Sequence, residues 1–465
     1  MGTGMTGVMR HGVQLLKTYE KDGKKYYLLK PEGVAHRVLA EDEDIRILFS
    51  FPLSDVTSFG RMPKWVRRKY KDIFRIIDDF VQHGFMQYMV DAMHGIAYTL
   101  KITMGCNFAC RYCYEAQRLG DNVVKMPKKI IREAIRKTAQ FGGGSIALHG
   151  GEPGLYPEGI EYAAKMAQKY KKRYKPAYLN VHVQTNGLVA YTALDIVKEY
   201  KIPVGISYDG GYQDKYRVFK DGSSTKEFVL KAIKILKEND VPLMGISVVD
   251  KDMDPKKIYE ENVKAGLTRF RMNPMYPVGH PILKDKMMPP ERYIEMLNTA
   301  LNNMLQNKEV HEKRIEEYVG PMWGIKPVVC VNIPCMAGLN FFDIDIEGNV
   351  ALCDAIPQIK VGNIMRDDWW DFMFHPASID FRFRHSELGK PCMTCPFKYH
   401  CDGGGCEGFL EQMGWPADRP GPFCPKTIFT KIYNLSYEDQ LRLAPKSARS
   451  TFGPYIWGNK DGKAL

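Results

Sequence analysis

The stretch that decides the fold is YTLKITMGCNFACRYC, residues 98–113, in which an apolar run passes directly into three cysteines. The run Tyr98–Met104 predicts a strand. Cys106, Cys110 and Cys113 follow it on one loop, at positions i, i+4 and i+7. Three thiolates so spaced can hold three irons of a cubane cluster and leave the fourth iron open for a ligand.

The residues downstream repeat an alternation of strand and helix. We expect six strands at Tyr98–Met104, Ser145–His149, Tyr178–Gln184, Pro203–Ser207, Leu243–Val249 and Thr268–Met272. The helical patterns between them include Pro127–Phe141, Glu158–Tyr174, Tyr191–Tyr200 and Thr225–Asn239. Repeated βα units with short connections predict an α/β fold, with a parallel sheet or partial barrel whose ligand site lies at the carboxyl ends of the strands.

The cysteine spacing, with an aromatic residue before Cys113, strongly resembles that of radical S-adenosylmethionine (SAM) enzymes. Structural zinc needs four protein ligands, and no fourth cysteine or histidine follows nearby; a disulfide would leave an odd thiol. The resemblance implies a partial (β/α)6 TIM-like barrel over residues 95–311. It also implies that SAM binds the open iron and, on reduction, gives a 5′-deoxyadenosyl radical that abstracts a hydrogen atom from the substrate.

The second strand ends in His149-Gly150-Gly151-Glu152-Pro153. Two glycines let the backbone approach a ligand, and a carboxylate can face an ammonium group. The segment resembles the GGEP motif of the family, which implies that Gly150, Gly151 and Glu152 bind the methionine end of SAM. For His149 we expect packing within the strand, with a chemical role as the alternative.

Small polar side chains follow the third and fourth strands, where they suit ribose hydroxyls and a carboxylate. The resemblance implies ribose contact for Ser207 and a supporting role for Gln184. It extends cofactor binding to Asn186 and Asp209, which could instead cap the turns that follow. It also places the backbone of Tyr112 near the adenine, so that the Tyr112 side chain need not be special.

Eight of the eleven cysteines come later in the chain, the number required by two four-cysteine clusters: Cys330, Cys335, Cys353, Cys392, Cys395, Cys401, Cys406 and Cys424. The amino terminus lacks a signal-peptide pattern, and no stretch is apolar enough to span a membrane. We therefore expect a cytoplasmic protein, in which clustered cysteines bind metal or take part in catalysis.

The later cysteines resemble those of the SPASM domain, which implies a loop-rich iron–sulfur domain over residues 312–465. The resemblance assigns Cys330, Cys335, Cys353 and Cys406 to one auxiliary 4Fe–4S cluster and Cys392, Cys395, Cys401 and Cys424 to another, giving three clusters in all. Four residues separate Cys401 from Cys406 where the family has three, and Gly403–Gly405 can absorb the insertion. The alternative is a zinc ribbon that uses Cys392, Cys395, Cys401 and Cys406. It would leave the other four later cysteines without a metal to bind.

Asp354 directly follows Cys353. In sulfatase-maturing members of the family an aspartate at this place acts as the base that deprotonates the substrate, and the resemblance extends that role to Asp354. The alternative is a polar residue that orders the cluster loop.

Residues 1–94 show three short strand patterns, Val13–Tyr19, Lys24–Lys30 and Val34–Leu39, followed by a helical pattern over Trp65–Val81. The arrangement resembles the winged-helix-like peptide-recognition domain of peptide-modifying enzymes, which binds a leader peptide as an added strand. The alternative is an amino-terminal cap with no binding role.

The composition, 45% hydrophobic and 26% charged over 465 residues, excludes a largely disordered or collagen-like chain. The net charge of +12 could suggest nucleic acid, an acidic membrane or an acidic peptide. The basic runs Arg67–Lys71 and Tyr170–Lys175 lie on predicted helices, and no nucleic-acid module accompanies them. We expect neither a nucleic-acid nor a membrane partner; an acidic leader peptide fits the first run.

Together these resemblances imply a radical SAM enzyme that abstracts hydrogen from a ribosomal precursor peptide and forms a thioether or carbon–carbon crosslink. Its partners would be a precursor peptide with a leader and a reductant such as flavodoxin or ferredoxin. The alternative is an anaerobic sulfatase-maturating enzyme that makes formylglycine from cysteine or serine. Those enzymes usually begin close to their first cysteine motif, whereas about 105 residues precede Cys106 here, which favours the peptide-modifying enzyme. A third possibility is a non-catalytic iron–sulfur or zinc protein that binds peptide or nucleic acid.

Overall fold

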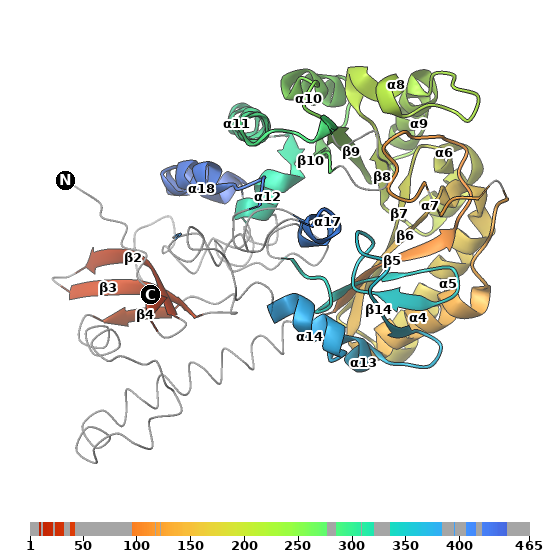
Figure 1. Ribbon diagram of the computed structural model, residues 1–465, viewed down its shortest axis with the longest axis horizontal. Coiled ribbons are helices and arrows are strands. Elements are labelled where there is room, and N and C mark those ends of the chain that lie inside the picture. The colour runs from red at the N-terminus through yellow and green to blue at the C-terminus, as the bar shows by residue number, and fades with distance from the viewer. Residues whose placement is uncertain are drawn as a thin grey trace, which may run out of the picture.

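Two sheets form the framework of the described part of the chain, one of ten strands and one of four (Figure 1). The computed structural model describes residues 9–10, 13–21, 24–31, 38–41, 95–116, 118–120, 122–276, 285–307, 309–319, 335–383, 395, 406–414 and 421–443. Among the helices within these ranges, none is long and apolar enough to cross a membrane.

Six parallel strands form the middle of the larger sheet and lie side by side in chain order. They are β5 (Ile96–Thr103), β6 (Gly143–Gly150), β7 (Tyr178–Thr185), β8 (Val204–Ser207), β9 (Leu243–Val249) and β10 (Arg269–Pro274). Every side chain of β5 is buried, as expected for a parallel strand covered on both faces. Each predicted strand is present, with its ends within two residues of the expected positions, so the α/β fold with a parallel sheet is confirmed.

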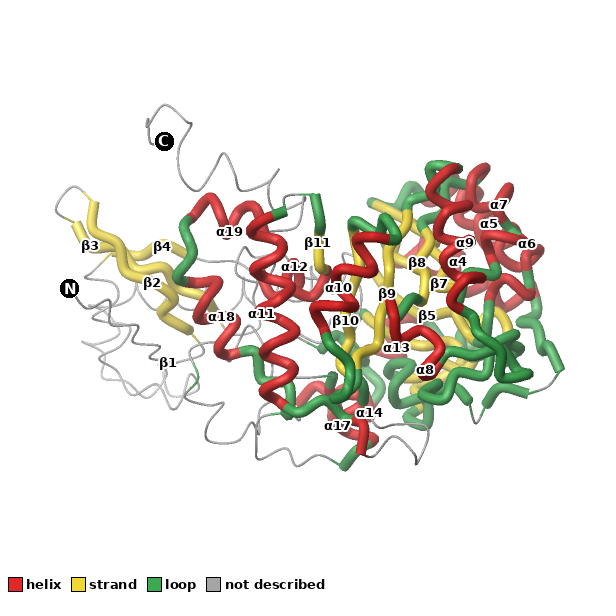
Figure 2. The backbone as a smooth tube through the Cα atoms, turned by 90° about the horizontal axis from the view of Figure 1, so that it is seen from above, coloured by secondary structure: helices red, strands yellow, loops and turns green. Residues whose placement is uncertain are grey.

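Helices cover the outer side of these strands (Figures 1 and 2). They are α4 (Lys128–Phe141), α5 (Pro157–Tyr174), α6 (Val189–Thr192), α7 (Leu194–Glu199), α8 (Gln213–Tyr216), α9 (Lys226–Glu238) and α10 (Pro255–Lys264). In α4, Ile130, Ile131, Ala134 and Ile135 are buried, and their helical spacing gives the apolar stripe that packs on the sheet.

The predicted helix Tyr191–Tyr200 is two short helices, α6 and α7. Ala193 separates them, with φ −139° and ψ 19°, outside the helical region. The prediction of one continuous helix was therefore wrong at this point, because an apolar period alone does not detect a break at a single residue.

The carboxy-terminal region continues the same sheet at both edges. On one side β11 (His311–Glu312) pairs in parallel with β10. On the other, β12 (Phe341–Ile344) pairs in parallel with β5 and is followed by antiparallel β13 (Asn349–Ala351) and β14 (Lys360–Asn363). The predicted boundary between residues 311 and 312 falls within β11.

The remaining helices belong to this carboxy-terminal half. They are α11 (Pro290–Gln306), α12 (Lys313–Val319), α13 (Trp369–Met373), α14 (Pro376–Phe383), α17 (Glu407–Gln412), α18 (Lys426–Tyr433) and α19 (Tyr437–Leu443). Trp369 is 1% exposed, and its ring lies 5.2 Å from that of Tyr98 on β5 and 5.6 Å from that of Phe342 on β12. Apolar packing thus joins the carboxy-terminal region to the barrel sheet.

The smaller sheet lies near the amino terminus and is antiparallel throughout. Its strands, in order, are β1 (Met9–Arg10), β2 (Val13–Lys21), β3 (Lys24–Pro31) and β4 (Val38–Glu41). The three predicted strand patterns correspond to β2, β3 and β4, although β4 begins four residues later than expected. The predicted helix over residues 65–81 lies outside the described residues.

Candidate active site

A cavity of about 390 Å³ opens where the parallel strands end. It also reaches the segment that leads into β12 and the segment that follows β13. The predicted site residues that line it are Cys106, Cys110, Tyr112, Cys113, Gly150, Gly151, Glu152, Gln184, Asn186, Ser207, Cys335, Cys353, Asp354 and Cys406. Asp209, Cys395 and Cys424 are not among its lining residues, and Cys330, Cys392 and Cys401 lie outside the described residues.

The three thiols of the cysteine loop lie close enough to influence one another electrostatically. Burial raises the pKa of Cys106 and of Cys110 to about 12, and it raises the pKa of Cys113 as well. The Cys106 sulfur also accepts the backbone N–H of Phe108 at 3.4 Å and faces Asn186 Nδ2 at 3.7 Å. Thiolates that are unfavourable alone become stable when iron supplies positive charge, so this donor set fits a cluster.

Contacts with the segment after β8 fix the shape of this loop. The backbone N–H groups of Ala109 and Arg111 donate to the carbonyls of Val218 and Tyr216, at 2.8 and 2.9 Å. The ring of Phe108 packs edge-on against that of Phe219, with centroids 5.1 Å apart. These contacts hold the cysteine loop against the segment that follows β8.

Gly150 and Gly151 bring the end of β6 against the base of the cysteine loop. A Cβ on Gly150, whose φ is +123°, would lie 2.0 Å from the carbonyl oxygen of Thr103, and one on Gly151 would lie 2.0 Å from that of Gly105. The N–H of Gly151 donates to Thr103 and that of Glu152 to Gly105, both at 2.8 Å. The close approach that requires these glycines is thus one between two strand ends, which sequence reasoning did not foresee.

The Glu152 carboxylate is held by the end of β7. Its Oε1 accepts the Thr185 hydroxyl at 2.6 Å and the N–H of Gly154 at 2.8 Å, while Oε2 accepts the N–H of Asn186 at 2.7 Å. Burial raises the pKa of Glu152 to about 7, against the lowering effect of these hydrogen bonds. The contact of Glu152 with SAM stays a prediction.

Gln184 and Ser207 meet at the cavity wall. Gln184 Nε2 donates to the Ser207 hydroxyl at 3.1 Å. The Gln184 side chain lies across Gly205, where an added Cβ would be 2.1 Å from Gln184 Oε1. This geometry suits the predicted pair, in which Gln184 supports and orients Ser207.

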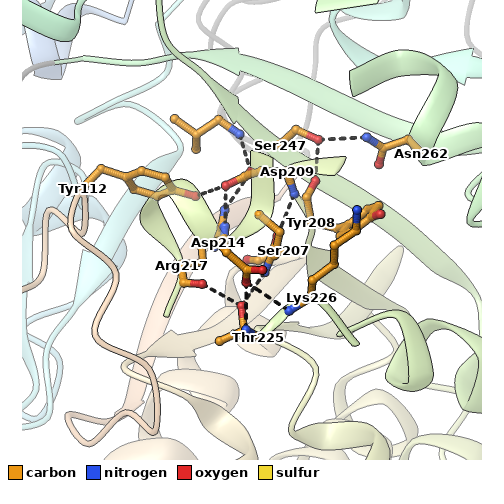
Figure 3. A network of polar contacts seen from close by, with 12 residues as sticks. Tyr112, Ser207, Tyr208, Asp209, Asp214, Arg217, Thr225, Lys226, Ser247 and Asn262 are labelled. Atoms are coloured by element: carbon orange, nitrogen blue, oxygen red, sulfur yellow. Dashed lines mark hydrogen bonds and ion pairs between the residues drawn. The ribbon is translucent and has the colours of Figure 1, made fainter. Parts of the chain in front are cut away.

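Asp209 lies behind the cavity wall in a buried polar network (Figure 3). Its carboxylate accepts the Tyr112 hydroxyl at 2.5 Å, Arg217 Nε at 2.8 Å and the N–H of Val248 at 2.9 Å. Arg217 also lies 5.0 Å from the centroid of the Tyr112 ring and faces the cavity. The Tyr112 side chain therefore takes part in this network, which the sequence did not require, and the Asp209 side chain does not cap the short helix that follows it.

Asn186 caps the turn that follows it and also contacts the cysteine loop, while its contact with the cofactor stays a prediction. Its Oδ1 accepts the N–H of Leu188 at 3.3 Å, which caps the turn that follows, and its Nδ2 donates to Asn107 Oδ1 at 2.8 Å. Asn186 thereby links the end of β7 to the cysteine loop.

Asp354 and His149 face the same cavity. Asp354 Oδ2 accepts the hydroxyl of Tyr114, the residue after Cys113, at 2.9 Å. His149 Nδ1 is buried with no hydrogen-bond partner among the described residues. Burial lowers the pKa of His149, and Asp354 opposes that shift. Sequence reasoning did not single out Tyr114, although its place beside Cys113 was a usable signal.

Three carboxy-terminal cysteines, Cys335, Cys353 and Cys406, share the cavity with the cysteine loop. A Cβ on Gly408 would lie 2.8 Å from the Cys353 sulfur, so the start of α17 brings the Cys406 segment against Cys353. This proximity agrees with the predicted assignment of the three to one cluster, which stays a prediction. In the described part of the chain no three His, Cys, Asp or Glu side chains converge on one metal ion; a cubane cluster places its thiolates on separate irons.

Comparison with known families decides the class. Residues 100–274 match the radical SAM superfamily, and residues 335–396 match the SPASM iron–sulfur cluster-binding domain. The chain is a radical SAM enzyme with a SPASM domain. SAM and iron–sulfur clusters are accordingly its cofactors, as predicted, while the number of clusters stays a prediction.

Relatives of this radical SAM enzyme include anaerobic sulfatase-maturating enzymes. The serine-type anaerobic sulfatase-maturating enzyme of Klebsiella aerogenes is 26% identical over 327 residues, covering 66% of this chain and 78% of that enzyme. The structure of anSMEcpe with bound AdoMet has a TM-score of 0.62 at 20% identity and covers 73% of this chain and 96% of that one. Streptococcus suis SuiB bound to precursor peptide SuiA has a TM-score of 0.52 at 16% identity, covering 85% and 95%. The two structures share the fold.

Proposed function

We propose that this enzyme modifies a ribosomal precursor peptide by hydrogen-atom abstraction and oxidative crosslinking. The observation that carries the proposal is the single cavity lined both by the cysteine loop and by Cys335, Cys353 and Cys406. A substrate residue in this cavity would lie between the two sets of thiols. The SuiB likeness, in which a precursor peptide is bound, supports a peptide as the occupant.

In this proposal Cys106, Cys110 and Cys113 hold the cluster that binds SAM. Gly150, Gly151 and Glu152 meet the methionine end of SAM, while Ser207 and Gln184 meet the ribose. Bound SAM and the clusters supply a 5′-deoxyadenosyl radical and an acceptor for the electron released on oxidation. The protein's own side chains position the substrate and exclude water.

Asp354 is the proposed base, because its carboxylate faces the cavity and the Tyr114 hydroxyl holds one of its oxygens. The second oxygen can then accept a proton from the substrate residue. His149, on the neighbouring wall, offers a ring nitrogen for hydrogen bonding to the substrate backbone.

The amino-terminal sheet is the proposed binding site for the leader. Among the described strands, β1 and β4 each have a neighbour on one side only, which leaves edges to which a strand can be added. The reductant is proposed to be a flavodoxin or a ferredoxin.

The second candidate is formylglycine formation in a sulfatase, which the Klebsiella relative favours because the match covers 78% of that enzyme. One experiment separates the two. Reconstituted enzyme is incubated anaerobically with SAM, reductant and either a candidate precursor peptide or a sulfatase-derived peptide, and the products are examined by mass spectrometry and with a carbonyl-reactive hydrazine. A peptide that loses two hydrogens, resists fragmentation between two residues and does not react with hydrazine supports crosslinking. A hydrazine-reactive product, formed from the sulfatase peptide alone, would overturn it.

A further inference from the structure

Three charged side chains lie buried behind the cysteine loop and have no role in the chemistry above. Lys101 is on β5, Glu115 follows the loop two residues after Cys113, and Asp343 is on β12. Their side chains are 0%, 2% and 1% exposed. Lys101 Nζ lies 2.8 Å from Glu115 Oε1 and 2.8 Å from Asp343 Oδ2, so one lysine joins three separate segments.

Two further contacts complete this cluster. Arg118 NH2 lies 2.8 Å from Glu115 Oε2, and the Thr99 hydroxyl donates to Asp343 Oδ1. Two cations therefore balance two carboxylates. Stability alone does not account for such a cluster, because apolar side chains of similar volume often replace buried ion pairs without loss. What the ion pairs add is a fixed geometry.

The position of Glu115, two residues after Cys113, indicates that the ion pairs control the placement of the cysteine loop. Glu115 is tied through Lys101 to Asp343 on β12, while its neighbour Tyr114 donates to Asp354, next to Cys353. Two consecutive residues at the exit of the cysteine loop are thus fastened to two different segments of the SPASM domain. The segment after Cys113 cannot shift without breaking one of these contacts.

We propose that Lys101, Glu115 and Asp343 are positioning residues that set the cysteine loop, and with it the radical-forming cluster, at a fixed orientation to the SPASM wall of the cavity. The proposal rests on the radical SAM assignment and not on the identity of the peptide. Its test therefore uses no peptide, and the failure of one proposal can be told from the failure of the other.

The test uses the reconstituted holoenzyme and two nearly isosteric variants, Asp343→Asn and Glu115→Gln. Each removes one negative charge. The matched control is Lys137→Met. Lys137 is a buried lysine on α4 that also joins the barrel to the SPASM domain, with Nζ 2.7 Å from the Asp367 carbonyl and 3.3 Å from Asp368 Oδ1. It lies on the outer helix layer, and the cysteine loop is not among its partners.

Iron content, the electron paramagnetic resonance spectrum of the reduced protein with and without SAM, and the rate of 5′-deoxyadenosine release are measured for each protein. We expect Asp343→Asn and Glu115→Gln to retain iron but to show an altered SAM-dependent spectrum. We expect 5′-deoxyadenosine release to fall by about tenfold to a hundredfold, because small misplacements of reacting groups cost this much. The double variant should lose more than either single variant, because it leaves the buried Lys101 with neither of its two carboxylate partners. Lys137→Met should match the wild type.

Wild-type spectra and rates in the two carboxylate variants would overturn the proposal. So would equal changes in Lys137→Met, which would show that any loosening of the two domains has the same effect. If Asp343→Asn fails to hold its iron, Thr99→Val takes its place, because it removes one hydrogen bond to Asp343 and no charge. We expect a smaller spectral change of the same kind, and an unchanged spectrum would refute the proposal.

Discussion

Gly150→Ala tests how the end of β6 supports the cysteine loop. The new Cβ would lie 2.0 Å from the Thr103 carbonyl oxygen, whereas real Cβ contacts are essentially never shorter than 3.0 Å, so the strand ends must separate. Separation weakens two hydrogen bonds, from Gly151 to Thr103 and from Glu152 to Gly105, worth about 1 kcal/mol each. An alanine at φ +123° adds about 1–3 kcal/mol of backbone strain. The sum, about 3–5 kcal/mol, is a large part of the roughly 5–15 kcal/mol that stabilises a typical protein.

Gly222→Ala is the control for this prediction. Gly222 also has a positive φ, +83°, but nothing lies within 4 Å of its added Cβ, so the substitution carries strain of about 1–2 kcal/mol without a clash. The assay is the thermal unfolding midpoint and the iron content of both variants, prepared anaerobically. We expect Gly150→Ala to unfold at a clearly lower temperature than Gly222→Ala and to retain less iron. Equal midpoints and equal iron would refute the argument that the glycine supports the loop.

Three further predictions concern the cavity wall. Burial raises the pKa of Glu152 from 4.5 to about 7, so protonated Glu152 stabilises the folded iron-free protein below pH 4.5. This contribution, about 3 kcal/mol, is lost as the pH rises through 7. In Glu152→Gln, chemical denaturation should therefore show a smaller fall in the free energy of unfolding over the same pH range. Asp354→Asn should release 5′-deoxyadenosine without modified peptide, and full product yield by mass spectrometry would exclude Asp354 as the base. Gly205→Ala should displace Gln184 from Ser207 and so weaken SAM binding by about fivefold, which is the effect of losing one hydrogen bond. Calorimetric titration with SAM measures this change. An unchanged affinity would show that Ser207 and Gln184 do not belong to the SAM site.

The parallel strands could be predicted from sequence because each is a short apolar run between turn signals. The pairing of β12 with β5 could not, because it joins Asp343 to Thr99, 244 residues apart in the chain, through a strand of four residues. A sequence pattern identifies strands one at a time, and only tertiary contacts decide which edge a short strand joins.

In the candidate site, too, local patterns could be predicted from the sequence and contacts between distant segments could not. Motif spacing predicted the cysteines and the polar strand ends, most of which line one cavity. The two side chains that bond to Asp209, Tyr112 and Arg217, come from two different segments, and no local pattern relates them. Lys101 did carry a signal, since a lysine is the single charged residue of β5 and is rarely buried without a charged partner. The sequence could not say that the carboxylates would be Glu115 and Asp343.

The pairing of β12 with β5 also explains why a charged residue stands on each of these buried strands. Asp343 lies opposite Thr99, and Lys101, two residues further along β5, faces the same side of the sheet as Thr99. A slip of one residue would turn Asp343 to the other face and place Phe342 or Ile344 beside Lys101. Lys101 would then lose one of its two carboxylates, at a cost of about 3–5 kcal/mol for breaking a buried pair. Apolar strands of four residues resist such a slip weakly, so the ion pair fixes the register at the edge where the SPASM domain joins the barrel.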